Sequence, residues 1–155
     1  MVQREIEEEV LPYCKREKIA ILGYSPLAQG VLTGRYNAAN RPKDISRADN
    51  RLFSDANLRE IQKVLTVLSA AAKRHQKTVA QIALNWLLQR PTVDNVVIGA
   101  RNEEQLRQNL LAVGWKLTTE QIAKLDKASD RTPIYPYWHQ RQFVERNPSP
   151  VPLVG

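Results

Sequence analysis

One stretch of the chain combines residue types that suit the binding of an anion. A β-branched run over residues 96–98 ends in Gly99, and Arg101 and the potential helix cap Asn102 follow it. A helix N-terminus presents free backbone N–H groups and the positive end of its dipole, and an arginine adds a fixed positive charge. We interpret the stretch as a strand-to-helix turn that can hold a phosphate, although an ordinary turn with a solvated arginine fits the same residues.

A second stretch, earlier in the chain, has a similar arrangement. An apolar strand over residues 19–23 leads into a loop with Ser25, Pro26 and Gly30, and Arg35 follows. If the two strands lie side by side in parallel, their C-terminal ends bring both loops to one face. In α/β barrels this face holds the active site, and the loops after the last two strands often bind phosphate.

The segments YSPLAQGVLTGRY and VVIGARNEEQLRQNLLAVGW resemble the last two barrel strands of the aldo-keto reductases, which are NADP(H)-dependent (β/α)8-barrel oxidoreductases. The resemblance runs from about residue 2 to about residue 145. It implies an α/β fold that is a partial TIM barrel, made of the last two βα units, a C-terminal helix and an irregular tail. We therefore divide the chain into residues 1–130, the C-terminal part of the barrel, and residues 131–155, a tail rich in proline and aromatic residues.

The resemblance also implies a binding site for NADP(H) that uses both stretches. Residues 25–35 would surround the pyrophosphate, with Arg35 where the family commonly has lysine. Gly99 and Arg101 would meet the adenosine ribose and its 2′-phosphate, assisted by Gln105. Gln108 and Asn109 would hold the adenine. The implied cofactor-binding residues are Ser25, Pro26, Leu27, Gln29, Gly30, Arg35, Gly99, Arg101, Gln105, Gln108 and Asn109.

Two details of this site bear on its selectivity. A 2′-phosphate favours an arginine, whereas a free 2′-hydroxyl favours an acid; Arg101 therefore predicts NADPH rather than NADH, and Glu103 and Glu104 are expected to point away along the helix. Gln108 departs from the glutamate often found in the family, and its amide oxygen can still accept from the adenine amino group.

By the same resemblance, the family's catalytic Asp, Tyr, Lys and His belong to strands that precede this chain. We therefore predict no catalytic residue and no metal ligand here, and interpret Met1 as an internal position of the family, which would make the chain a fragment. The predicted function is that of the NADP(H)-binding part of an enzyme that reduces aldehydes and ketones, inactive alone because a carbonyl substrate needs the complete barrel. The alternative is a non-catalytic nucleotide-binding or interaction protein derived from a reductase.

The composition argues against a nucleic-acid-binding, a membrane-spanning and a secreted protein. The formal net charge is +7, but the basic residues are scattered, so we predict no nucleic-acid partner and retain a basic adaptor only as a third hypothesis. No apolar run is long enough for a membrane span, the N-terminus lacks a signal peptide, and a single Cys14, expected to be buried, fits a reducing cytoplasmic location. Several cations crowd the loop after the first strand and could meet the charges of a dinucleotide: Arg35, Arg41, Lys43, Arg47 and Arg51.

The elements that position these residues follow from hydrophobic periodicity and capping signals. We expect a helix over residues 3–17 with Ile6, Val10 and Cys14 inward, a strand at 19–23 buried on both faces, a long polar loop at 37–54, and helices at 56–75 and 78–90. The resemblance to the family implies that this loop lies over the cofactor and clamps it, and a floppy insertion is the alternative. A buried strand at 96–98 and a helix at 102–111 follow, and a capping box at 118–121 starts a short helix.

Four side chains outside the cofactor site have expected places. Trp86 should belong to the core, and His75 should be a solvated cation at a helix end. The tail from Arg131 should have little regular structure. C-terminal loops help to line the substrate pocket in the family, so the resemblance implies that Tyr137 or Trp138 could contribute to such a pocket. Two barrel strands alone leave their edges unpaired, so we predict self-association, poor solubility, or pairing with an N-terminal barrel part.

Overall fold

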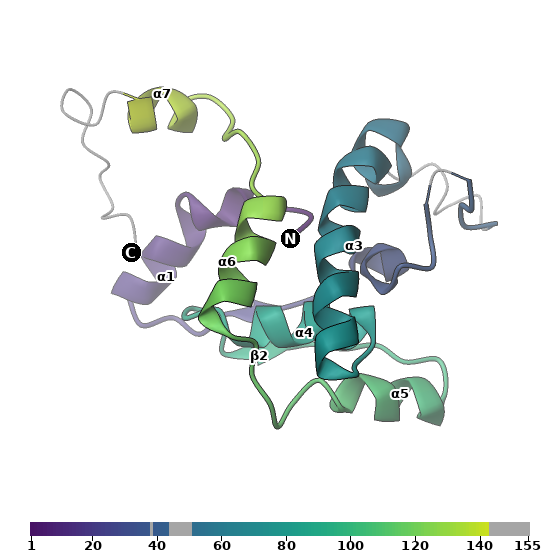
Figure 1. The fold of residues 1–155 in the computed structure, drawn as a ribbon. Coiled ribbons are helices and arrows are strands. Elements are labelled where there is room, and N and C mark those ends of the chain that lie inside the picture. The colour runs from purple at the N-terminus through teal and green to yellow at the C-terminus, as the bar shows by residue number, and fades with distance from the viewer. Residues whose placement is uncertain (38, 44–50, 143–155) are drawn as a thin grey trace.

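The computed structural model describes residues 1–37, 39–43 and 51–142. In this part a small sheet lies beside a layer of helices, as Figure 1 shows. The elements in chain order are η1 (Glu5–Glu7), α1 (Val10–Arg16), β1 (Leu22–Gly23), η2 (Ala28–Thr33), η3 (Arg51–Phe53), α3 (Asp55–His75), α4 (Val79–Leu88), β2 (Asn95–Val96), α5 (Glu103–Leu110), α6 (Thr119–Ala128) and α7 (Tyr137–Gln142), where η marks 3-10 helices.

The sheet has two parallel strands. Leu22 of β1 stands opposite Asn95 of β2, and Gly23 stands opposite Val96. The backbone N–H of Val97 donates to the carbonyl of Gly23 at 2.8 Å, which extends the pairing beyond β2. The chain passes between the strands through α3 and α4, so β1 and β2 form a parallel crossover unit, as the predicted α/β class requires.

The prediction that both strands are buried is wrong. Each strand is two residues long, and Leu22 exposes 62% of its surface. Helix α4 contacts β2 on one side of the sheet, and no third strand pairs with either edge among the residues that the structure describes. Burial on both faces needs neighbouring strands and helices that these residues do not supply.

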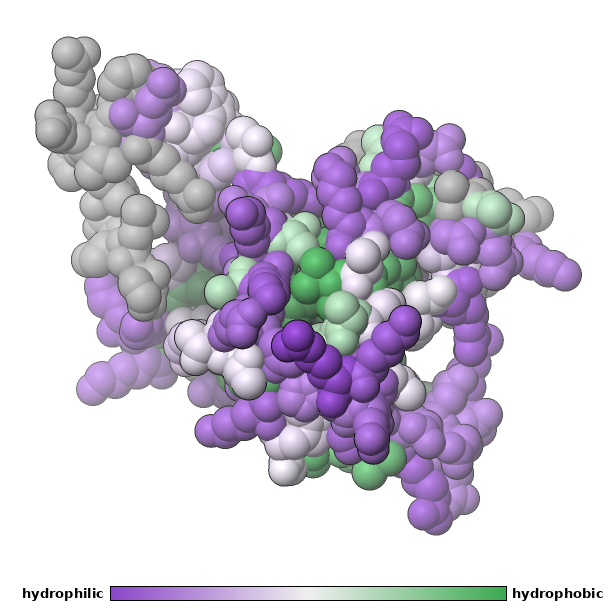
Figure 2. Space-filling view, viewed as in Figure 1, coloured by the Kyte–Doolittle hydropathy of each residue, from purple (hydrophilic) through white to green (hydrophobic). Residues whose placement is uncertain are grey.

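The core lies between α3, α4 and α6. Helix α3 contacts both other helices, and its inward positions recur every three or four residues from Leu58 to Ala72. Leu68, Ile82 and Leu125, one from each helix, have no exposed surface. Apolar residues gather in the middle of the face in Figure 2, within a largely hydrophilic surface. The inward placement of Leu125 and the expected helical spans of α3 and α4 are confirmed to within a few residues.

Three helices begin at the caps that the sequence predicts. The Thr78 side chain accepts from the backbone N–H of Gln81, and the Gln81 side chain accepts in return from that of Thr78. Thr118 and Gln121 form the same capping box for α6. Asn102 caps α5 by accepting from the backbone N–H of Gln105 at 2.9 Å. These caps depend only on local sequence, which explains why they could be predicted.

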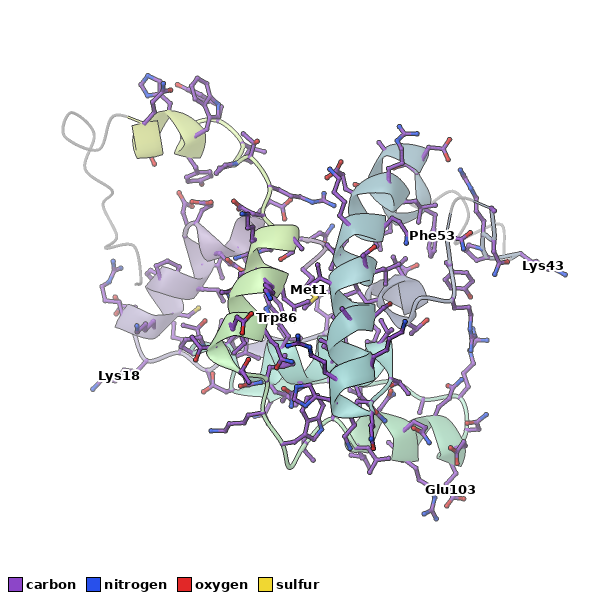
Figure 3. The ribbon with its side chains drawn as sticks, viewed as in Figure 1. Met1, Lys18, Lys43, Phe53, Trp86 and Glu103 are labelled. Carbon is purple, nitrogen blue, oxygen red and sulfur yellow. The ribbon has the colours of Figure 1, made fainter. Side chains whose placement is uncertain are left out.

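Two aromatic clusters join the helices. The indole N–H of Trp86 donates to Asp126 of α6 at 2.8 Å, and the Arg90 guanidinium lies 4.4 Å from the Trp86 ring, so Trp86 belongs to the core as predicted (Figure 3). His75 is half-buried rather than solvated, because its Nε2 lies 2.9 Å from the Gln121 side-chain oxygen and its ring lies 4.9 Å from that of Trp115.

The N-terminal segment departs from the expected helix. The predicted helix over residues 3–17 is divided into η1 and α1, and only Cys14 of its three expected inward side chains is buried, while Ile6 and Val10 are exposed. Helix α1 packs mainly against η1, which leaves these two side chains about half exposed.

The tail also departs from expectation, because it forms helix α7 near α1 (Figure 1). A hydrogen bond from the Tyr137 phenol to Glu9 of the N-terminal segment raises the phenol's pKa above its usual value. The predictions for Arg47, for the Arg51 side chain and for residues 143–155 lie outside the described residues.

Candidate functional site

A cleft of about 880 Å³ opens between the loop after β1 and the segment that leads from β2 into α5 and along that helix. All of the cofactor-binding residues implied by the sequence line it, those of residues 25–35 on one wall and those of residues 99–109 on the other. The parallel pairing of β1 with β2 brings the two walls together, since both segments follow the C-terminal ends of these strands. A volume of this size is within the range of pockets for small molecules and cofactors.

The loop wall has an unusual backbone. Ser25, Ala28 and Gln29 have φ values of 51°, 48° and 56°, in the left-handed region that costs an L-residue about 1–2 kcal/mol. Gly30 has a φ of 95°, and an added Cβ there would lie 3.2 Å from the Tyr36 ring. The carbonyl of Gly30 accepts from the Thr33 hydroxyl at 2.7 Å, which fixes this turn. Such conformations persist where the surrounding structure holds them, and they occur often at binding sites.

The helix wall uses its side chains to order its own backbone. Gln105 accepts from the backbone N–H of Arg101 at 2.9 Å, so one of the predicted ligand-binding side chains also shapes the turn before α5. An added Cβ at Gly99 would meet nothing within 4 Å. The chain's own packing therefore does not require glycine at this position, and the open space beside it belongs to the cleft.

The charges in the cleft differ in part from expectation. Of the cations expected to meet a dinucleotide, Arg35 and Arg101 line the cleft, whereas Arg41 forms an ion pair with Asp55 and Lys43 lies away from the body of the protein (Figure 3). Glu103 bonds to Arg107 at 2.6 Å and points outward, as predicted.

Glu104 does not point away, because it lines the cleft and accepts from the Gln108 side-chain amide at 2.8 Å. The spacing of three residues from Arg101 to Glu104 was the only sequence signal for this position, since such residues share a helix face.

Sequence reasoning missed other parts of the lining. Thr78 and Ala80 come from the start of α4, a helix with no apparent connection to ligand binding in the sequence. Thr33 and Tyr36 belong to the loop wall, and Tyr24, Val97, Ile98 and Ala100 flank the strand ends. Thr78 and Ala80 reach the cleft only because α4 packs against α5.

Two expected contributors are absent from the lining as the structure describes it. The described residues of the 37–54 loop do not reach the cleft, and Phe53 of this loop is fully buried in the core instead. Tyr137 and Trp138 do not line it either, and Tyr137 instead forms a hydrogen bond with Glu9 of the N-terminal segment. In the same part of the chain, no group of three or more His, Cys, Asp or Glu residues could hold a metal ion, and no helix is long and apolar enough to cross a membrane.

The described lining of the cleft combines charged, hydrogen-bonding and aromatic groups, with Tyr24 and Tyr36 as its two aromatic members. Its described lining contains two arginines and one glutamate among amides, hydroxyls and apolar groups, and it includes no histidine, lysine or cysteine. A ligand that fits has an anionic part near the arginines and a neutral, hydrogen-bonding part near the amides.

Comparisons with known proteins agree on one family. A profile described as "Aldo/keto reductase family" matches residues 1–130. The chain is similar to an oxidoreductase of Mycobacterium bovis, with 38% identity over 122 residues that cover 79% of this chain and 37% of the relative. It is also similar to the NADH-specific methylglyoxal reductase of Escherichia coli, with 31% identity over 118 residues that cover 76% of this chain and 36% of that enzyme.

A solved structure extends the similarity to the fold. The structure of a glycerol dehydrogenase from Gluconobacter oxydans matches with a TM-score of 0.72 and 28% sequence identity, over 86% of this chain and 42% of that one. In each of these comparisons the chain spans less than half of the length of the protein it matches.

Proposed function

Because the chain belongs to the aldo/keto reductase family, we propose that it is the part of such an oxidoreductase that binds NADP(H). The observation that carries the proposal is the convergence of all the implied cofactor residues on one cleft of about 880 Å³. These residues come from segments far apart in the sequence, and no local pattern would bring them together by itself. A common ligand gives this convergence a reason.

The chemistry of the cleft fits a dinucleotide phosphate. Arg35 and Arg101 supply positive charge on opposite walls, which suits the pyrophosphate and the 2′-phosphate. The open space at Gly99 lets a ligand approach the backbone without displacing a side chain. The bound cofactor would supply the hydride that reduces a carbonyl group. The residues of this chain would hold the cofactor and orient it.

We infer that the chain prefers NADPH to NADH. Arg101 supports this inference, since a 2′-phosphate favours an arginine. Glu104 opposes it, and a relative with 31% identity is named an NADH-specific enzyme, so preferences differ within the family. The preference between NADPH and NADH depends on whether the Glu104 carboxylate keeps its hydrogen bond with Gln108, at 2.8 Å, or accepts one from the ribose hydroxyl.

The chain alone should not catalyse the reaction. The family's catalytic Asp, Tyr, Lys and His have no counterparts here by the resemblance of the motifs, and the described lining of the cleft includes no lysine or histidine. In a complete barrel we propose the family reaction, the NADPH-dependent reduction of aldehydes or ketones to alcohols. A non-catalytic nucleotide-binding or interaction protein is the second candidate, favoured by the same lining.

The exposed strand layer supports a partner. Leu22 and Tyr24 expose 62% and 85% of their surfaces at one end of β1, and both strands have a free edge in the described structure. We propose that this surface pairs with an N-terminal barrel part or with a second copy of the chain. The single cysteine, Cys14, is buried and unpaired, which is compatible with the cytoplasmic location that we propose.

Calorimetric titration of the purified 155-residue chain with NADPH and with NADH tests the cofactor proposal. We expect saturable binding of NADPH, weakened about tenfold in Arg101→Ala, because one charge-assisted contact is lost. Arg107→Ala is the matched control, since Arg107 lies on the same helix and bonds outward to Glu103. If neither NADPH nor NADH bound, the proposal would be overturned. In a separate assay, aldehyde-dependent oxidation of NADPH would show that the chain is active alone.

A further inference from the structure

Two side chains hold the backbone of Arg35, one of the two arginines that line the cleft. The Arg35 N–H donates to the Thr33 hydroxyl at 3.2 Å, and the Arg35 carbonyl accepts from the Asn40 side-chain amide at 3.0 Å. Arg35 makes no hydrogen bond to another backbone group among the described residues. The place of Arg35 on the loop wall therefore depends on Thr33 and Asn40.

The Thr33 hydroxyl joins Arg35 to the left-handed turn that precedes it. This hydroxyl donates its proton to the Gly30 carbonyl at 2.7 Å and accepts from the Arg35 N–H through a lone pair. Gln29 and Gly30, with φ values of 56° and 95°, form the turn and line the cleft themselves. Thr33 thus fixes the position of Arg35 relative to the backbone that a ligand in the cleft would meet.

Asn40 is held in turn by a closed loop of hydrogen bonds. The backbone N–H groups of Asn37 and Asn40 each donate to the carbonyl of the other, at 3.1 and 3.2 Å. The Asn37 side-chain oxygen accepts from the backbone N–H groups of Ala39 and Asn40, at 2.9 and 2.8 Å. These residues begin the predicted clamping loop and do not line the cleft. Their contact with the cleft runs through the Asn40 amide, which donates to the Arg35 carbonyl.

The residue after Arg35 is tied to the core. The Tyr36 ring lies edge-on to the ring of Phe53, with 5.6 Å between the ring centres, and Phe53 has no exposed surface. The backbone of Arg35 is therefore held before, at and after this residue. A cation whose backbone is already fixed loses less conformational freedom when it binds an anion, so its contact contributes more to affinity.

We propose that Thr33 and Asn40 are positioning residues, which hold Arg35 on the loop wall so that its guanidinium meets a phosphate group of the bound dinucleotide. Neither side chain needs to contact the ligand. The proposal rests on the proposed function, since it takes a dinucleotide as the occupant of the cleft. It gives residues 37–40 an indirect role in place of the direct contact expected of their loop.

The test is a double-mutant cycle, measured by calorimetric titration of the 155-residue chain with NADPH. We expect Arg35→Ala to weaken binding about tenfold, because a charge-assisted contact is lost. Thr33→Val should weaken it about threefold, since valine is similar in shape and lacks the hydroxyl. In the Arg35→Ala background, Thr33→Val should have no further effect, because the group that Thr33 positions is gone.

Two further readouts separate positioning from a general loss of structure. Thr33→Ser should keep the wild-type affinity, because serine retains the hydroxyl. The affinity of Thr33→Val should also depend less on NaCl concentration than that of the wild type and approach the dependence of Arg35→Ala, since an ionic contact is weakened. Asn40→Ala should behave as Thr33→Val does, with a loss of about threefold that disappears in the Arg35→Ala background.

Thr66→Val is the matched control. The Thr66 hydroxyl also donates to a backbone carbonyl, that of Gln62 at 2.9 Å, but it lies on the exposed face of α3 and does not line the cleft. This variant should keep the wild-type affinity for NADPH and its dependence on salt.

The remaining outcomes overturn the inference in distinguishable ways. If Thr33→Val weakened binding equally with and without Arg35, the hydroxyl would act on the turn at Gly30 and not through Arg35. If Arg35→Ala had no effect while Arg101→Ala weakened binding, Arg35 would not meet the ligand, and the cofactor proposal would stand. If no dinucleotide bound at all, the proposed function itself would fall, and the inference with it.

Discussion

The helical layer and the strand layer of this protein differ in how their apolar side chains are covered. Between α3, α4 and α6, side chains such as Leu68, Ile82 and Leu125 have no exposed surface. On the strand layer, Leu22 and Val97 expose 62% and 52% of theirs. The helices complete a core with residues from this chain alone, whereas the sheet would need further strands to be covered.

This difference also applies to the two walls of the cleft. The helix wall of the cleft is tied to the covered layer, since Gln81 reaches from α4 to α5, and Asn85 donates to the carbonyls of Ala112 and Trp115 just beyond it. The helix wall of the cleft is therefore held by contacts within the helical layer.

The sharpest test of the contrast is a pair of leucines. Leu125→Ala should lower the free energy of unfolding by about 2–5 kcal/mol, because it removes fully buried methyl groups and leaves a cavity. Leu22→Ala should change it by no more than about 0.5 kcal/mol, because this side chain is mostly exposed. Urea denaturation followed by circular dichroism measures both. A comparable loss in the two variants would show that the strand layer is covered in solution.

A pair of asparagines extends the comparison to polar groups. Asn85 is 2% exposed, and its amide serves two carbonyls on the loop between α5 and α6, at 2.8 and 2.9 Å. Asn85→Ala should cost about 1–3 kcal/mol, since it leaves buried partners without a hydrogen bond. Asn109→Ala in the cleft should cost less than about 0.5 kcal/mol, because its bond to the Gly99 carbonyl is long, at 3.4 Å.

For the binding of NADPH, we expect Asn109→Ala to have the larger effect of the two substitutions. Asn109→Ala should weaken binding of NADPH several-fold with little change in unfolding, if this side chain holds the adenine. Denaturation curves recorded with and without NADPH measure both effects in one experiment. Should Asn109→Ala unfold as easily as Asn85→Ala, the cleft would be part of the stable core rather than a site held open by it.

The sequence predicted features that depend on local patterns. The caps at Thr78, Asn102 and Thr118 each need only a short run of residues, and all three are confirmed. The family and the segments that meet at the cleft also followed from two motifs, because parallel strands bring their C-terminal ends together. Whether these segments bind a dinucleotide remains a prediction.

Features that depend on tertiary surroundings could not be predicted. The left-handed backbone at Ala28 and Gln29 carries no glycine signal, and the loop's own contacts hold it. The contact between Gln108, which donates to Glu104, and Gln81 depends on the packing of α4 against α5. The short, exposed strands at Leu22 and Asn95 contradict an apolar pattern that assumes a covered sheet.

The smallest effects in the comparison should come from two aspartates. Asp126 accepts from the Trp86 indole and, at 2.8 and 3.0 Å, from Arg90, whose side chain is only 18% exposed. Asp126→Asn keeps an acceptor but removes the charge, so we expect a loss of about 1 kcal/mol that shrinks as salt is added. In the strand layer, Asp94 accepts from the backbone N–H of Ile21 at 2.7 Å in an exposed position. Asp94→Asn retains that acceptor and should change the unfolding free energy by less than about 0.5 kcal/mol at any salt concentration.

The salt dependence of the cost of Asp126→Asn distinguishes two explanations of why this cost exceeds that of Asp94→Asn. If partial burial strengthens the Asp126–Arg90 pair, the cost of Asp126→Asn should fall between 0.05 and 0.5 M NaCl by only a fraction, on the order of a third, because water and ions are largely excluded from it. If the pair behaves as an exposed one, the cost should vanish in high salt and match that of Asp94→Asn. A partial loss of the cost would mean that the helical layer excludes enough water to strengthen an ion pair. A complete loss would mean that this layer is more stable than the strand layer only because its apolar side chains are packed.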